Sequence, residues 1–467
     1  MSDLLSIGAS GVRAYQTALT AVGENIANVG TDGYSRRTVS MQEVSSAAGL
    51  SANKVSAGSG VMVVGIARAT DVYASAAVRA ATADLSRTTT GATWLSRVES
   101  AMTGDQVQTR LTSFFTAART LSADPSSQAL RSTMLEAARS TATAFSATNG
   151  AFDQIQADFD GQARQAAQDL SSLATSLVRV NDGLGRTQPG TAAAAQLADQ
   201  RDQILAKMSG LSDITSTTDE LGRATVRLGS QGGPVLASTD NVGSVVYDPN
   251  VRQFAVAMKG QVQSFTPSGG SMAGMLDGWE RIETTRKAFN TVAENFVDQV
   301  NALQSSGKDL GGYTLANGQD AQGNTVFQSK MFVLSGNTGD TSRNMSLVMT
   351  DGARIAASTA TGSTSGVRNS DTLSALENLR SSTSGGNYEN RLTAIVTDNA
   401  TALKQRQTVA DAQSAISDGA KATLSAASGV TLDSEAVTLM RFQQAYSATS
   451  RVIQAARETF QSILELR

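Results

Sequence analysis

Cysteine and histidine are both absent from this chain of 467 residues. Without them, no thiolate nucleophile, zinc–thiolate site, haem-attachment motif or histidine-based catalytic triad can form. No disulfide can stabilise the fold, and an oxidising exterior carries no risk of mispaired cysteines. These absences exclude the commonest catalytic centres, and they fit a secreted protein.

An excess of charge of one sign and long apolar runs are missing as well. The 38 basic and 41 acidic residues are spread along the chain and give a net charge of -3. A nucleic-acid-binding protein would gather its basic residues on one face, so we expect no nucleic-acid partner. No apolar run reaches the roughly 18 residues of a membrane span, so we expect no membrane insertion. Residues 1–3 carry no positive charge, so we also expect no cleaved secretory signal.

Proline and aromatic residues are scarce. The five prolines lie between residues 125 and 267, and aromatic residues make up 5% of the chain. Because proline interrupts helices, the segments on either side can form long ones. Apolar residues that step by threes and fours predict a helix over about residues 127–181, roughly 75 Å long at the standard rise. A helix of this length indicates an elongated molecule.

Alternating patterns indicate strands in three parts of the chain. Residues 36–44 and 61–66 read as two short strands around a Gly/Ser-rich loop. Residues 210–270 alternate between apolar and polar side chains and contain a strong turn, Asp248-Pro249-Asn250, which predicts an antiparallel meander. The segment 307–387 is rich in Gly, Ser, Thr and Asn, and we expect it to form loops with a few more strands.

The two ends of the chain carry apolar repeats of seven residues. The repeating residues, called the seam residues below, are Leu5, Val12, Leu19 and Ile26 near the start and Leu432, Leu439, Tyr446, Ile453 and Phe460 near the finish. A repeat of this period keeps one narrow face turned toward a partner helix. We therefore predict that the ends lie together as a coiled pair. The alternative is two separate amphipathic helices in an ordinary bundle.

A short motif ends the first predicted helix. It consists of Asn25, Ile26, Ala27 and Asn28, followed by Thr31, Asp32, Gly33, Tyr34, Ser35 and Arg36. On its own it reads as a helix C-terminus, because asparagine and glycine leave a helix easily with positive φ and glycine permits a tight turn.

Further segments give this motif a more specific meaning. They are Leu197–Leu205, which contains Asp199-Gln200-Arg201-Asp202, and Ser428–Asp433 with Gln443–Tyr446 and Arg451–Gln454. Together these segments resemble the flagellar axial protein family, whose members share an N-terminal helix that ends in Asn-Ile-Ala-Asn and a Gly-Tyr or Gly-Phe turn. The first 100 and last 80 residues carry the resemblance, and residues 110–210 support it.

The resemblance implies a structural protein, not an enzyme, and no cofactor or metal. Within the family, the Tyr-Ser-Arg continuation favours a subunit at the junction between hook and filament; the alternative is a hook or distal-rod subunit. The expected fold is mainly α with a β-rich insert, in an elongated multi-domain rod. Its parts would be a terminal coiled-coil domain (1–35 and 428–467), a helical rod domain (36–210, 270–306 and 388–427) and a β-rich outer domain (211–269 with parts of 307–387).

The resemblance also implies partners. They would be further copies of the chain in a ring or helical assembly, hook subunits on one side and a second junction protein, hook-associated protein 3, on the other. An export chaperone would bind the C-terminal helix. The location would be the extracellular flagellum, reached without a cleaved signal.

Three segments show weak chemical patterns. Residues 317–324 resemble a calcium loop but lack the required oxygen spacing and a closing glutamate. The Ser/Thr-rich residues 358–366 are expected to form a loop and not a glycosylation platform. Asp199, Arg201 and Asp202 are expected to form a surface ion-pair set and not a charge relay.

Overall fold

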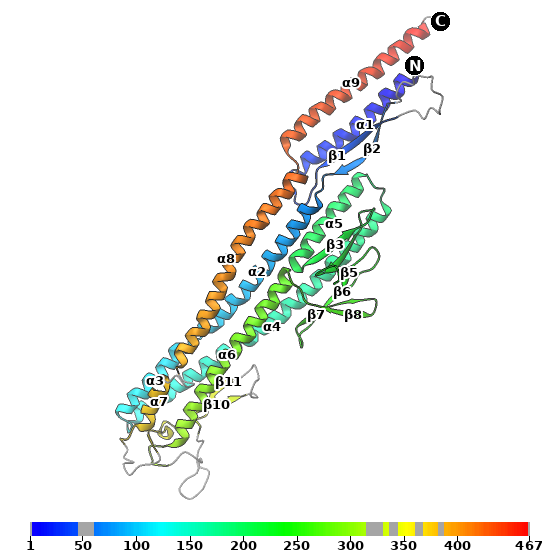
Figure 1. The fold of residues 1–467 in the computed structure, drawn as a ribbon. Coiled ribbons are helices and arrows are strands. Elements are labelled where there is room, and N and C mark those ends of the chain that lie inside the picture. Colours follow the sequence, from blue (N-terminus) through cyan, green and yellow to red (C-terminus); the bar gives the residue numbers. More distant parts are fainter. Residues whose placement is uncertain are drawn as a thin grey trace. The chain divides into compact units, whose positions relative to one another are not determined.

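A computed structural model describes residues 2–44, 60–313, 330–335, 344–359, 368–381 and 387–465. Helices dominate these residues (Figure 1). They are α1 (Ser2–Ala27), α2 (Val72–Gly104), α3 (Val107–Ala123), α4 (Gln128–Arg186), α5 (Ala192–Leu211), α6 (Gly270–Ser306), α7 (Asp371–Ser381), α8 (Tyr388–Ser428) and α9 (Leu432–Glu465), with a short 3-10 helix, η1 (Gly352–Arg354).

The strands form small antiparallel sheets. They are β1 (Arg37–Glu43), β2 (Val61–Arg68), β3 (Ile214–Thr218), β4 (Ala224–Leu228), β5 (Val235–Ala237), β6 (Ser244–Asp248), β7 (Gln253–Met258), β8 (Gln261–Phe265), β9 (Gly307–Lys308), β10 (Phe332–Ser335), β11 (Asn344–Leu347) and β12 (Ser358–Thr359). β1 pairs with β2, β9 with β12 and β10 with β11. The prediction of a mainly helical fold with a β-rich insert is confirmed.

The insert contains two three-stranded sheets where the sequence predicted one meander. Their strand orders are β3-β4-β5 and β6-β7-β8. The chain leaves the first sheet through a turn in which the backbone N–H of Asn241 donates to the hydroxyl of Ser238 at 3.2 Å. The backbone N–H of Gly243 then donates to the carbonyl of Leu236 at 2.7 Å. This turn separates the two sheets.

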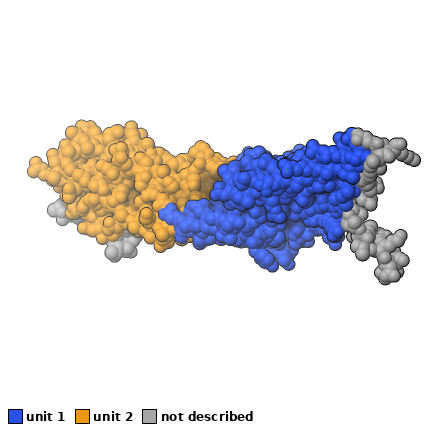
Figure 2. All heavy atoms as spheres, turned by 90° about the horizontal axis from the view of Figure 1, so that it is seen from above, with its two compact units in different colours: residues 1–87, 164–273, 411–467 blue, residues 88–163, 274–410 orange. Residues whose placement is uncertain are grey.

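The described chain divides into two compact units (Figure 2). Unit 1 contains residues 1–87, 164–273 and 411–467, and unit 2 contains residues 88–163 and 274–410. The sequence grouped residues 211–269 with parts of 307–387 in one β-rich domain. These segments belong to different units, the first to unit 1 and the second to unit 2. The three-domain division remains a prediction.

The core of unit 2 is built from aromatic rings. Phe296 is fully buried and lies at its centre. Its ring packs 5.4–6.2 Å, centroid to centroid, from those of Phe114, Phe115, Phe145, Phe332 and Tyr388. Burial raises the pKa of the Tyr388 phenol, whose hydroxyl donates to Gln299 at 2.8 Å. The few aromatic residues of the chain are thus concentrated where helices α3, α4, α6 and α8 contribute to this unit.

Helix α7 corrects the expectation of loops and strands for residues 307–387. Its residues Leu373 and Leu376 are buried within unit 2. The side-chain oxygen of Asn369 accepts from the N–H of Asp371 at 2.9 Å and marks the start of the helix. The apolar repeat covers only one turn and is surrounded by Gly, Ser and Thr, so periodicity alone did not reveal it.

Candidate assembly interface

Helices α1 and α9 of unit 1 pack side by side and run antiparallel (Figure 1). A Cβ placed on Gly8 would lie 2.6 Å from Cγ1 of Ile453, and one on Gly11 would lie 2.7 Å from Cγ2 of Thr449. Further along, the rings of Tyr15 and Phe442 lie 6.2 Å apart. Residue numbers rise on one helix as they fall on the other. The chain ends therefore pair, as the heptad repeats predicted, through a close approach at two glycines.

The face of α1 that is most buried is not the one that the large apolar residues define. Apart from Val22 and Asn25, its buried residues are small: Gly8, Gly11, Ala14, Ala18 and Ala21. The seam residues Leu5, Val12, Leu19 and Ile26 are only partly buried. Glycine and alanine at steps of three and four were the sequence signal for this face. The heptad pattern of large side chains does not reveal this face.

On α9, the seam residues differ in how far the chain itself covers them. Leu439, Tyr446 and Ile453 are partly buried, whereas Leu432 and Phe460 are 52% and 50% exposed. Ile453 already contacts Gly8, so Phe460, one heptad further on, extends beyond the first residues of α1. Its ring is therefore half exposed in the single chain. The role of the seam residues in assembly remains a prediction.

Asn25 of the motif lies at the base of the helix pair and is 1% exposed. Its Nδ2 donates to the carbonyl of Arg37 at 2.9 Å and to Oε2 of Glu435, on α9, at 3.0 Å. Its Oδ1 accepts from the hydroxyl of Tyr34 and from the N–H of Arg37, both at 2.9 Å. An amide side chain offers two donors and two acceptor positions, so this side chain is fully used. The hydrogen bonds of Asn25 thus connect it with Tyr34, Arg37 and Glu435.

The other motif residues shape the turn that carries Tyr34 to this position. Asn28 ends α1 by donating its side-chain N–H to the carbonyl of Glu24 at 2.9 Å, and Thr31 is exposed. Gly33 has φ +76°, and Gln203 of α5 donates to the carbonyl next to it, that of Asp32, at 2.9 Å. The N–H of Arg36 donates to the carbonyl of Ser428 at 2.8 Å. The turn thus joins α1, α5 and the end of α8 within unit 1.

The Asp-Gln-Arg-Asp segment of α5 supplies carboxylates to the arginines of β1 and β2. Asp199 lies 2.9 Å from Nε of Arg68 and 3.6 Å from Arg37, and Ser35 accepts from Arg68 at 3.3 Å. Asp202 also pairs with Arg68. The expected surface ion-pair set is therefore wrong for Asp199, which is only 6% exposed, because β1 and β2 cover this face of α5.

Burial sets the electrostatics of this region. It raises the pKa of Asp199 above its ordinary value, although Arg68, a hydrogen bond from Ser35 and Arg37 act in the opposite direction. Burial also raises the pKa of Tyr34, against the effect of Arg37, whose guanidinium lies 5.1 Å from the centre of its ring. Asn25, Asp199 and Glu435 thus belong to a buried polar junction.

The raised pKa of Asp199 predicts a pH dependence of stability. The folded state holds this proton more tightly than the unfolded state, so the stabilising effect is fully present below the ordinary pKa of 3.8 and is lost as pH rises through the folded value. Asparagine does not titrate. Between about pH 3 and about pH 7, the free energy of unfolding of Asp199→Asn should therefore rise relative to wild type. Urea titrations across this range measure the trend, and a difference independent of pH would contradict it.

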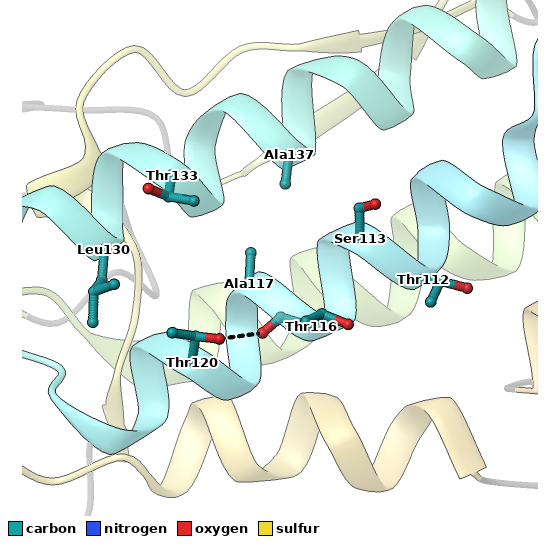
Figure 3. Close-up of a pocket in the computed structure, with 8 residues that line it drawn as sticks. All are labelled: Thr112, Ser113, Thr116, Ala117, Thr120, Leu130, Thr133 and Ala137. Atoms are coloured by element: carbon teal, nitrogen blue, oxygen red, sulfur yellow. Dashed lines mark hydrogen bonds between the residues drawn. The ribbon is translucent and has the colours of Figure 1, made fainter.

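A shallow groove in unit 2 contains no titratable group. About 350 Å³ in volume, it lies between α3 and the start of α4 (Figure 3). Its lining residues are Thr112, Ser113, Thr116, Ala117, Thr120, Leu130, Thr133 and Ala137. The hydroxyls of Thr112, Ser113, Thr120 and Thr133 donate to carbonyls four residues earlier in their own helices. None of the lining residues is an acid or a base, although the hydroxyl of Thr112 also donates to Oε1 of Glu389 at 3.2 Å.

The described residues also bear on metal binding and on membrane insertion. The described residues include no group of three or more acidic side chains placed to hold a metal ion. Residues 317–324, with the weak calcium pattern, and residues 360–366 of the Ser/Thr-rich stretch lie outside the described residues. Across the described ranges, no helix combines the length and the apolar character that a membrane crossing requires.

Two models of known protein families match parts of the chain. A family model for the C-terminal region of the flagellar basal body rod FlgEFG proteins matches residues 424–466, which include all of α9. A second family model, for the helical domain of flagellar hook-associated protein FlgK, matches residues 95–321. Both models describe proteins of the bacterial flagellum, and they match α9 and the helical middle of the chain.

Curated relatives from several bacteria have the same name. Flagellar hook-associated protein 1 of Escherichia coli K12 is 23% identical over an alignment that covers 100% of both chains. The Salmonella typhimurium protein of the same name is 26% identical over 67% of this chain and 58% of its own length. The Bacillus subtilis protein is 25% identical over 66% of this chain and 59% of its own. The chain is thus similar to flagellar hook-associated protein 1 of several bacteria, and residues 95–321 match the model for the helical domain of that protein.

A solved structure shares the fold. The flagellar hook junction protein FlgK from Burkholderia pseudomallei superimposes with a TM-score of 0.59 at 15% identity, over 74% of this chain and 98% of that one. Its name, like those of the relatives above, describes a component of the flagellum.

Proposed function

We propose that the chain is a structural subunit of the bacterial flagellum that forms the junction between hook and filament. The observation that supports this most directly is the antiparallel pairing of α1 and α9, which brings both chain ends into one exposed helical element. Copies of such an element can pack against one another in a helical or ring assembly. The three-domain organisation deduced from the sequence, with the terminal pair as the inner part, belongs to this proposal.

A second axial role, that of a hook or distal-rod subunit, has support from one observation. The family model that matches α9 describes rod proteins. That helix is shared across axial proteins, so it does not separate the two roles. The match over residues 95–321 is specific to a hook-associated protein and favours the junction.

The partners follow from the position in the flagellum. Hook subunits would lie on one side and hook-associated protein 3 on the other, outside the cell, after export without a cleaved signal. An export chaperone would bind α9, whose residues Val437, Met440 and Val452 are 62%, 54% and 39% exposed. An apolar surface of this kind on a long helix suits a chaperone that holds it before assembly.

Phe460→Asp tests the assembly role of α9. The ring is half exposed in the single chain, so the new carboxylate stays hydrated and stability should change by no more than about 0.5 kcal/mol. In the assembly, neighbouring helices would cover this position, and a buried unpaired carboxylate costs several kcal/mol in every subunit. We expect cells that carry the variant to export it normally but to shed flagellin and lack filaments under the electron microscope.

The matched control is Val262→Asp on β8, a residue 69% exposed and distant in sequence from the terminal helices. It should leave filaments intact. Immunogold labelling of purified hook–basal bodies should place the wild-type chain at the distal end of the hook. Labelling along the hook or the rod would favour the second role, and full-length filaments on Phe460→Asp cells would contradict the assembly role of this residue.

A further inference from the structure

The contacts along the α1–α9 pair change in character from its base to its tip. At the base, Asn25 and Glu435 form a hydrogen bond between side chains that are 1% and 5% exposed. Toward the tip, Gly11 lies against Thr449 and Gly8 against Ile453, so small and apolar groups make the contact. A buried polar pair therefore lies at the base of the α1–α9 interface, whose contacts toward the tip are small and apolar.

The apolar part of the interface discriminates weakly between alignments of the two helices. Leu439, Tyr446, Ile453 and Phe460 follow one another every seven residues. A shift of α9 by one heptad, roughly 10 Å along its axis, therefore replaces each large apolar residue with another one. Burial of apolar surface would be nearly the same in the shifted and unshifted pairs, and in pairs formed between two copies of the chain.

The polar pair of Asn25 and Glu435, in contrast, does discriminate between alignments of the two helices. In the observed alignment, residue 25 faces residue 435, residue 11 faces 449 and residue 8 faces 453. A shift of one heptad in one direction would bring Glu435 opposite Ala18, which is fully buried. A shift in the other direction would bring Asn25 opposite Phe442. Either shift leaves a buried carboxylate or amide without its partner, and an unpaired buried polar group is strongly disfavoured.

We propose that Asn25 and Glu435 are the residues that fix the register of the α1–α9 pair and favour pairing within one chain over pairing between copies. Asn25 is suited to this because its three other hydrogen bonds, with Tyr34 and the backbone of Arg37, hold its amide in one orientation. The arrangement acts as a buried asparagine does in a coiled coil, where one polar position specifies the alignment. The proposal rests on the geometry of the single chain and stands independently of the proposed place in the flagellum.

Disulfide trapping can read the register directly, because the chain has no cysteine of its own. A Cβ on Gly11 would lie 3.3 Å from Cβ of Thr449, close to the separation in disulfides, so Gly11→Cys with Thr449→Cys reports the observed register. Gly11→Cys with Ala456→Cys reports a shift of one heptad, and Thr449→Ala is added to this pair because it removes the Cγ2 that would lie 2.7 Å from the new Cβ. In the otherwise unaltered chain, a mild oxidant should close the first pair within the chain and the second at least tenfold more slowly.

Glu435→Leu is the test variant. It should raise the rate of the shifted crosslink at least tenfold and add crosslinked dimers, which migrate at twice the mass on a non-reducing gel. Glu435→Gln keeps an oxygen that can accept from Asn25, so it should restore the wild-type pattern. Gln443→Leu, an exposed position on the same helix, adds the same apolar side chain without touching the pair and should change nothing.

Circular dichroism verifies that each variant keeps its helices. If Glu435→Leu loses helix, Asn25→Leu with Glu435→Leu removes both polar groups and gives a uniformly apolar interface on which the same crosslinks are measured. Crosslinking confined to the observed register, at the wild-type rate and without dimers, would overturn the proposal in either variant. The short connection at residues 429–431 between α8 and α9 would then set the register by itself.

Discussion

Gly11→Leu should separate α9 from α1. A Cβ at this position would lie 2.7 Å from Cγ2 and 3.3 Å from Cβ of Thr449, and Cβ cannot move without its backbone. Inserting a leucine into so close a contact typically costs about 1–3 kcal/mol. Because proteolysis follows the population of the open form, a loss of about 2 kcal/mol should speed the cleavage of α9 roughly thirtyfold.

Gly23→Leu is the matched control. It lies on the same helix and is exposed, and no atom lies within 4 Å of the position of its Cβ. Since leucine favours a helix over glycine by up to about 1 kcal/mol, this variant should protect the terminal helices slightly. Equal rates of cleavage in the two variants would show that the close approach at Gly11 does not hold the pair together.

Phe296→Ala should destabilise unit 2 more than any other single truncation in its core. The ring is fully buried and contacts five other aromatic rings. Removing a buried phenylalanine costs about 3–5 kcal/mol, and the lost ring pairs bring the effect to the upper end of this range. Trp94 and Trp279 both belong to unit 2, so their fluorescence in a urea titration reports the unfolding of this unit.

Phe460→Ala serves as the control for this measurement, because its ring is 50% exposed and belongs to unit 1. It should leave the tryptophan transition where it is in the wild type. A midpoint for Phe296→Ala within the error of the wild type would mean that the unit repacks around the missing ring.

Local patterns predicted much of the fold. The helix expected over about residues 127–181 is α4, Gln128–Arg186, and the strands expected at 36–44 and 61–66 are β1 and β2. These elements follow from periodicity over neighbouring residues, which the chain displays directly. Helix α7 was not predicted, because a helix of eleven residues with one buried turn shows too little periodicity to be recognised in the sequence.

The site was harder to predict because its contacts join distant parts of the chain. Asn25 and Glu435 are 410 residues apart, and the sequence gives no sign that one faces the other. The motif around Asn25 was recognised as the end of a helix, but its contact with α9 was not. Likewise, the burial of Asp199 depends on Arg37 and Arg68 from strands that lie over it, and helical spacing alone suggested a surface position.

Each of the two units is built from segments that are distant in the sequence, and this affects the order of folding. Unit 1 takes residues from the beginning, the middle and the end, and unit 2 is assembled from two segments separated by more than a hundred residues. Consider a chain that emerges with its N-terminus first, either from a ribosome or through a narrow channel. Unit 2 is incomplete until residue 410 has emerged, and unit 1 is incomplete until the residues after 410 have emerged as well. Contacts so distant in sequence form slowly, because long loops must close first. Either unit can therefore close only after most of the chain has emerged, so the early segments wait for late ones before they can pack.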